Sequence, residues 1–198
     1  MKKPIFLVII LAIAAVAGYW QYREYLQNPE TKIIRIVNNT SLGVTKVLLL
    51  ENENSIENLK ITHKDLFENL EIHYAQVNSN ISELEKMGAT QNINREKVGI
   101  LMKYLQSSQQ VLTAEYDKYQ KSIEYTNALK MVRLQETGVA VSGDVNSKQI
   151  EYEKAKEELA KALIKLSDAC SMAGEVISKD NLVERQVIDK AIGKYQKK

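Results

Sequence analysis

Apolar residues between positions 92 and 174 recur in steps of three and four, which keeps one face of a helix apolar. The more regular half is the second, whose predicted seam is Tyr152, Ala155, Leu159, Ala162, Leu166, Ala169 and Ala173. Alanine at every second seam position would let a neighbouring helix approach closely. The first half repeats less strictly, through Val98, Leu101, Leu105, Leu112, Tyr116, Tyr119 and Ile123. The pattern predicts an elongated antiparallel coiled-coil hairpin.

The turn of this hairpin is predicted at residues 138–143, with the sequence Gly-Val-Ala-Val-Ser-Gly. Val139, Ala140 and Val141 form an apolar tip, although an exposed turn is normally polar. Two interpretations stay open. The valines fold back and plug the end of the bundle, or the tip contacts a partner groove or a membrane surface, as clustered exposed apolar residues often do. We treat these three residues as a candidate docking loop.

A third helix is predicted over residues 56–87, because one heptad seam passes through Ile56, Leu59, Leu66, Leu70, Val77, Leu84 and Met87. The short connection at 88–91 predicts that this helix and the next are antiparallel neighbours. Residues 56–178 are therefore expected to form a three-helix coiled-coil bundle. A short last helix and a basic tail are expected over residues 179–198.

The seam over residues 56–87 also includes His63, His73 and Asn80. The two histidines lie about 15 Å apart by helical rise, so one metal ion could not bridge them. The favoured interpretation is that they are polar seam residues that set the register, or that Tyr74 and Ile81 turn inward instead. A pH-sensitive seam is the alternative, because charging two imidazoles would weaken the packing.

Residues 29–55 form the connector before this bundle. Two apolar runs, 32–37 and 44–50, are separated by Asn-Asn-Thr-Ser-Leu-Gly, which predicts two short strands in a hairpin or two short helices around a turn. No other strand candidates are available for pairing, which favours helix. Proline occurs only at Pro4 and Pro29, so the chain beyond residue 29 lacks this helix breaker. The predicted fold class is all-α.

The N-terminal segment, residues 1–28, is expected to be a membrane anchor or a signal peptide. The apolar run over residues 4–20 covers about 25 Å as a helix, against about 30 Å for a hydrocarbon core. A cleavable signal would use the small residues at 15–17. A transmembrane helix would explain the aromatic cluster Tyr19, Trp20, Tyr22 and Tyr25, which favours the anchor. Either interpretation leaves the N-terminus in the cytoplasm and exports the rest of the chain.

Charge argues against a nucleic-acid partner. The net charge is +2, and residues 1–29, with three bases and one acid, account for it, which leaves 24 of each in the remaining chain. Lys and Glu alternate along the predicted helices, as on a solvated helix surface, whereas nucleic-acid binders cluster their basic residues. Cys170 is the only cysteine, so no intramolecular disulfide can form. We interpret Cys170 as a small buried hydrophobe, with an intermolecular disulfide as the alternative.

The sequence lacks catalytic motifs. It contains no Gly-rich phosphate loop, no HExxH, no paired cysteines and no GxSxG. Helical rods also seldom enclose the pocket that a catalytic base and nucleophile need. We therefore expect no enzyme activity, no catalytic residues, no cofactor, no metal site and no small-molecule substrate.

The stretch MVRLQETGVAVSGDVNSKQIEYEKAKEELAKALIKL resembles the hairpin tip of periplasmic adaptor (membrane fusion) proteins of efflux pumps. That family has an Arg-Leu-Ser pattern before an Ala-rich return helix, and Arg133 and Ser142 would match its Arg and Ser. Gln135 stands where its Leu is expected, and residues 143–144 are extra. The resemblance covers about a fifth of the chain and implies a docking hairpin. No lipoyl-like or β-barrel stretches, which the family requires, flank it.

Helix direction also bears on this resemblance. If the helix over 56–87 leaves the membrane, the loop at 138–143 points back towards the anchor, whereas an adaptor tip must point away. Only a further antiparallel helix within residues 30–55 would reverse this direction.

The sequence as a whole predicts a non-enzymatic, membrane-anchored envelope protein in the bacterial inner membrane, with most of the chain periplasmic or extracytoplasmic. It would act as a helical scaffold or docking module in a secretion, efflux or cell-envelope assembly, with protein partners or self-association through its helices. Two alternatives remain. One is a spanin-like coiled-coil lysis protein that bridges envelope layers. The other is a cleaved, soluble periplasmic binding or chaperone module.

Overall fold

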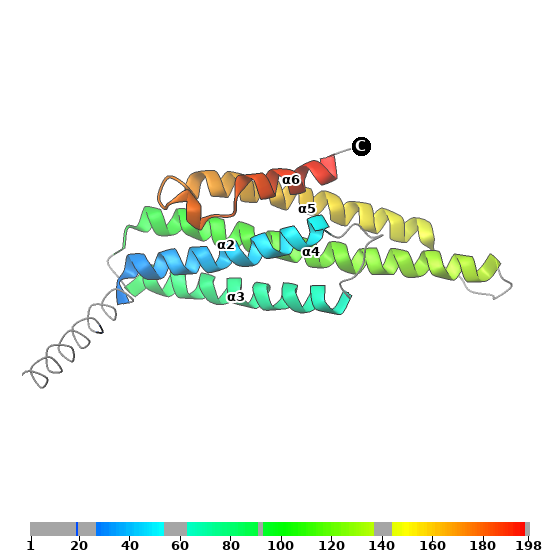
Figure 1. The fold of residues 1–198 in the computed structure, drawn as a ribbon, viewed down its shortest axis with the longest axis horizontal. Coiled ribbons are helices and arrows are strands. Elements are labelled where there is room, and N and C mark those ends of the chain that lie inside the picture. The colour runs from blue at the N-terminus through cyan, green and yellow to red at the C-terminus, as the bar shows by residue number, and fades with distance from the viewer. Residues whose placement is uncertain (1–18, 20–26, 54–62, 91–92, 137–143, 197–198) are drawn as a thin grey trace, which may run out of the picture.

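The computed structural model describes residues 19, 27–53, 63–90, 93–136 and 144–196. Its elements are Pro29–Glu53 (α2), His63–Thr90 (α3), Arg95–Glu136 (α4), Val145–Ala173 (α5), a 3-10 turn at Lys179–Asn181 (η2) and Arg185–Gln196 (α6). The described residues contain no strand, which confirms the all-α prediction for this part of the chain. The helices lie along one long axis (Figure 1).

Residues 29–53 form one continuous helix, where the sequence predicted two short elements. The polar run that resembled a turn lies inside α2, and its small side chains serve the packing. The Ser41 hydroxyl lies 2.8 Å from the Val37 carbonyl in the previous turn, and Thr40 accepts from the Asn80 amide at 2.9 Å. A Cβ at Gly43 would lie 2.9 Å from Nδ1 of His73. These turn-like residues therefore mark close helix contacts.

Cross-contacts fix the direction of α3 relative to α2. Arg35 pairs with Glu83 at 3.4 Å, whereas Gly43, two turns later on α2, lies against His73, which comes earlier on α3. The two helices are therefore antiparallel, and α2 is the additional helix that reverses the direction of everything after it.

The remaining helices follow in alternate directions. Glu30 near the start of α2 pairs with Lys97 near the start of α4, so these two helices run parallel. Lys121 pairs with Glu151 at 3.0 Å, and Lys148 pairs with Glu124 at 2.8 Å, so α5 runs against α4. The end of α4 and the start of α5 consequently lie far from the start of α2 (Figure 1).

One core runs through the region where α2, α3, α4, α5 and α6 pack together. Its largest fully buried side chains are Tyr104, Ile33, Ile36, Leu48, Leu70, Leu84, Leu101, Leu105, Leu112, Leu159, Leu163 and Leu166. We call this region the body. Among the described side chains, the last buried one on α4 is Lys118 and the first buried one on α5 is Ala155.

Tyr119 still packs against the core, and further out α4 and α5 extend past the other helices (Figure 1). We call residues 119–136 and 144–154 the projection. None of the side chains described for residues 119–132 and 144–154 is buried. The molecule thus has a body with a core and a two-helix projection without one.

The membrane segment predicted at residues 4–20 lies outside the described residues. Within the described part, the stretch Pro29–Leu50 of α2 is long and apolar enough to cross a membrane, judged by length and composition alone. Half of that stretch is buried against the rest of the protein, and the core helix of a folded domain meets the same criteria.

Candidate functional site: the two-helix projection

The projection consists of the last part of α4 and the first part of α5. α4 is 42 residues long and contains no proline. α5 starts at an N-cap, because the Asp144 carboxylate accepts a hydrogen bond from the Ser147 N–H at 2.9 Å. A capped first turn satisfies backbone donors that a helix would otherwise leave open. The start of α5 is therefore defined by its own sequence.

Four charged side chains join the two helices of the projection in a ring. Lys121 lies 3.4 Å from Glu124 and 3.0 Å from Glu151, and Lys148 lies 2.8 Å from Glu124 and 3.1 Å from Glu151. The hydrogen bond to Lys148 lowers the pKa of Glu124, and that to Lys121 lowers the pKa of Glu151. The same bonds raise the pKa values of both lysines. Each helix thus holds the other through alternating charges at the surface.

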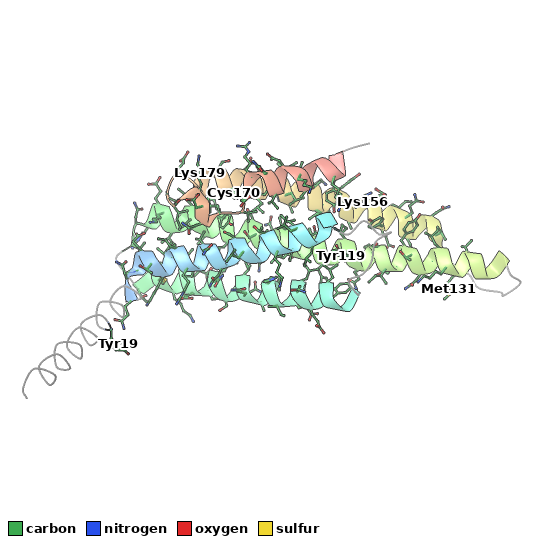
Figure 2. The ribbon with its side chains drawn as sticks, viewed as in Figure 1. Tyr19, Tyr119, Met131, Lys156, Cys170 and Lys179 are labelled. Carbon is green, nitrogen blue, oxygen red and sulfur yellow. The ribbon has the colours of Figure 1, made fainter. Side chains whose placement is uncertain are left out.

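Aromatic and apolar side chains complete the surface of the projection. The rings of Tyr125 and Tyr152 stack across the helix pair with their centroids 6.0 Å apart. Leu129 and Met131 on α4 are 37% and 42% exposed, and Ile150 on α5 is 68% exposed. Figure 2 shows Met131 far out on α4, well beyond Tyr119. The projection therefore presents apolar side chains to solvent on both helices.

The structure separates the two sets of site residues that the sequence singled out. Val139, Ala140 and Val141 lie outside the described residues. In the predicted seam, Tyr152 is half-buried within the projection, whereas Ala155, Leu159, Ala162, Leu166 and Ala169 are buried in the body.

Sequence reasoning missed Leu163, which is also buried. It follows Ala162 directly, so it lies to one side of the predicted seam. α5 packs against α6 as well as α4, which widens its buried face beyond a coiled-coil stripe. The signal that could have identified Leu163 is an apolar residue beside the seam.

An ion pair lies buried where the body ends. Lys118 Nζ is 2.6 Å from Glu115 Oε2 and 3.0 Å from the hydroxyl of Tyr195 on α6, and it lies 4.4 Å from the centre of the Tyr119 ring. The side chains of Lys118 and Glu115 are 5% and 0% exposed. Charges removed from water need such partners. This cluster was not predicted, because Lys and Glu in a helical sequence indicate a surface.

A second polar network holds η2 against the body. The Val183 N–H donates to the Tyr104 hydroxyl at 3.3 Å, and that hydroxyl lies 2.6 Å from the Ser41 hydroxyl. Ser41 Oγ in turn lies 2.6 Å from the Asn181 carbonyl. Burial raises the pKa of Tyr104 well above its ordinary value of 10, which keeps the phenol neutral. The network joins α2, α4 and the segment around η2.

Two observations in the described residues concern metal binding and thiol chemistry. They contain no group of three or more His, Cys, Asp or Glu side chains that could hold a metal ion. A hollow of about 720 Å³ between α5, η2 and α6 includes Cys170 among its lining residues. Burial raises the pKa of this thiol to about 12, so it is not a reactive thiolate at neutral pH.

Comparison with known proteins gives no relative. No protein-family model, no curated protein and no solved structure matches this chain. The adaptor-like stretch therefore stays a local resemblance.

Proposed function

We propose that this chain is a non-enzymatic docking protein, anchored by residues 4–20, which presents the projection to a protein partner. The observation that carries the proposal is the contrast in burial along α4 and α5. The two helices leave the body and expose Leu129, Met131 and Ile150. Ile150 is the most exposed of the large apolar side chains in the described residues, and such side chains can belong to an interaction site. The α4–α5 pair would then be the antiparallel coiled-coil hairpin predicted from the sequence.

The direction of the helices supports this proposal. α2 begins next to the proposed anchor, and α4 ends at the opposite end of the molecule (Figure 1). An anchor before α2 would place the projection away from the membrane, as an adaptor-like hairpin requires. The positive-inside rule would place the projection outside the cytoplasm, in the periplasm of a bacterial envelope. The partner would belong to a secretion, efflux or cell-envelope assembly.

The test is site-specific photo-crosslinking in intact cells of the native host. A photoreactive amino acid at Ile150 should capture one defined protein, whereas the same amino acid at Ile72, on the body, should not. The two positions make a matched pair, because Ile150 and Ile72 are 68% and 62% exposed. Replacing Met131 with serine should reduce capture from position 150 and leave the melting temperature unchanged. Equal capture from both positions, or none from position 150, would contradict a docking role for the projection.

The same cells distinguish the two alternative functions, a cleaved periplasmic module and a spanin-like lysis protein. An intact N-terminal peptide in the membrane fraction supports the anchor, whereas a mature N-terminus at Gly18 would indicate the cleaved periplasmic module. A spanin-like lysis protein would instead cause lysis when it is overproduced.

A further inference from the structure

The interface between α2 and α3 contains two polar side chains from α3, and their surroundings differ. The Asn80 amide donates to Thr40 Oγ1 at 2.9 Å and to the Ile36 carbonyl at 3.2 Å. Two turns earlier on α3, both ring nitrogens of His73 are buried and neither makes a hydrogen bond to α2, although the Gln76 side chain on α3 lies near enough to raise the pKa of the ring. A satisfied polar group stabilises an interface, whereas an unsatisfied one makes it sensitive to any added charge.

The His73 ring fits this place because α2 has a glycine opposite it. A Cβ on residue 43 would lie 2.9 Å from Nδ1 and 3.2 Å from Cγ of His73. The missing side chain at Gly43 thus lets the ring lie against the backbone of α2.

The electrostatic surroundings of His73 disfavour an added proton. Burial lowers the pKa of the ring below its ordinary value of 6.5, and the charge of Lys46 on α2 lowers it further. Gln76, one turn along α3, offsets part of this effect. Among the described residues, Lys46 is the charged side chain that acts on the ring. A protonated His73 would therefore place a second positive charge in the interface.

We propose that His73 is an acid-sensitive contact that loosens the C-terminal half of α2 from the N-terminal half of α3 when its ring takes up a proton. To be solvated, the imidazolium must leave the surface of Gly43. The contacts of Asn80 with α2 involve no titrating group, so the other half of the interface stays closed. The His73 contact involves α2, the helix next to the proposed anchor, and it is independent of the projection.

The direction of the pH effect follows from the lowered pKa. Above pH 6.5 the His73 ring is mostly neutral, both when it is packed against Gly43 and when it is released into solvent. Changing the pH in this range therefore has little effect on the contact. Below pH 6.5 the released ring gains a proton more readily than the packed ring, and the contact weakens. One proton can change the equilibrium by at most about tenfold per pH unit.

The experiment is amide hydrogen exchange on the full chain between pH 7.5 and 5.0, corrected for intrinsic exchange rates. Protection of residues 43–49 and 66–73 should fall as the pH drops below 6.5, by up to about tenfold per unit. Protection of residues 33–40 and 77–84 should stay constant. Uniform loss along both helices, or no loss, would overturn the proposal.

Variants identify the responsible ring. His73→Phe keeps a flat ring without a titrating group and should remove the pH dependence, whereas His63→Gln should retain it. A pH dependence that survives in His73→Phe would overturn the proposal. If His73→Phe does not fold, ring NMR of His63→Gln gives the answer, because His73 is then the only imidazole. A titration midpoint at or above 6.5 would overturn the proposal, and a lower midpoint with shifts at Gly43 and Lys46 would support it.

Discussion

Helices α4 and α5 run through both the body and the projection, yet among the described side chains of these two helices only those in the body are buried. Among the described side chains of α4 the last buried one is Lys118, and Lys121, one turn later, lies in a half-buried ion-pair ring. Helix-forming tendency cannot explain this difference, because α4 is continuous through both regions. The difference lies in which neighbours are present. The body has α2, α3 and α6 around α4 and α5, whereas the projection has only its own two helices.

This contrast predicts that substitutions in the body and in the projection have different effects. Residues of the body are constrained by packing, so changes there should be measured in unfolding. Residues of the projection have few packing constraints, so substitutions of their exposed apolar side chains should change stability little. Matched substitutions in the two regions should therefore differ in their effect on stability.

The largest effect is expected from Lys118→Met, which leaves Glu115 buried without its lysine. Removing one partner of a buried ion pair typically costs about 3–5 kcal/mol. The matched substitution in the projection, Lys121→Met, should change the unfolding midpoint much less, because the side chains of the ring are only half-buried and the partners left behind reach water. Urea unfolding followed by circular dichroism measures both variants.

A double variant provides the control for this comparison. Glu115→Leu together with Lys118→Met removes both charges, and it should recover much of the stability that Lys118→Met loses. Equal losses for Lys118→Met and Lys121→Met would show that the two regions do not differ in the way described here.

A smaller effect is expected in the seam of α5 from Ala162→Leu. Ala162 is buried, so three added carbons must displace neighbours, at a cost of roughly 1–3 kcal/mol. Lys161→Leu is the control, because Lys161 is exposed and pairs only with Glu158 on the same helix among the described contacts. Matching thermal melts for both variants would contradict the assignment of Ala162 to a packed face.

Periodicity predicted the long helices well, because a buried helix face repeats its apolar residues at a fixed spacing. Leu66, Leu70, Val77 and Leu84, predicted on one seam, are all buried. The same reasoning misassigned Tyr116, which is 38% exposed and packs edge-on against Phe67 of α3. Tyr104 is the buried aromatic of α4 instead. Spacing alone does not say which of several neighbouring helices a side chain faces.

The continuity of α2 and the burial of Lys118 could not be predicted for a common reason. Asn, Thr, Ser and Gly favour turns in isolation, and Lys favours solvent, so local propensity gives the wrong answer for both. What reverses these preferences is tertiary: α3 approaches Gly43 closely, and Tyr195 of α6 covers Lys118. The projection itself was also not predicted, because it is defined by where the other helices end.

The smallest effect concerns the ion-pair ring of the projection and its response to acid. The pKa values of Glu124 and Glu151 are lowered from 4.5, so the ring contributes fully above pH 4.5 and is lost as the pH falls through the lowered values. The lysines set the other limit, since their pKa values are raised above 10.5 and the contribution is lost only as the pH rises through these raised values. Because these side chains are only half-buried, global melts should barely change, and the local measurement is amide exchange over residues 121–130 and 146–152. Protection there should stay constant from pH 7 to pH 5, the range in which the His73 contact weakens, and should decrease below pH 4.5.

Glu151→Gln should reduce protection at pH 7, whereas Glu157→Gln, further along α5, should not. If these two variants exchange alike, the ring does not hold the projection together.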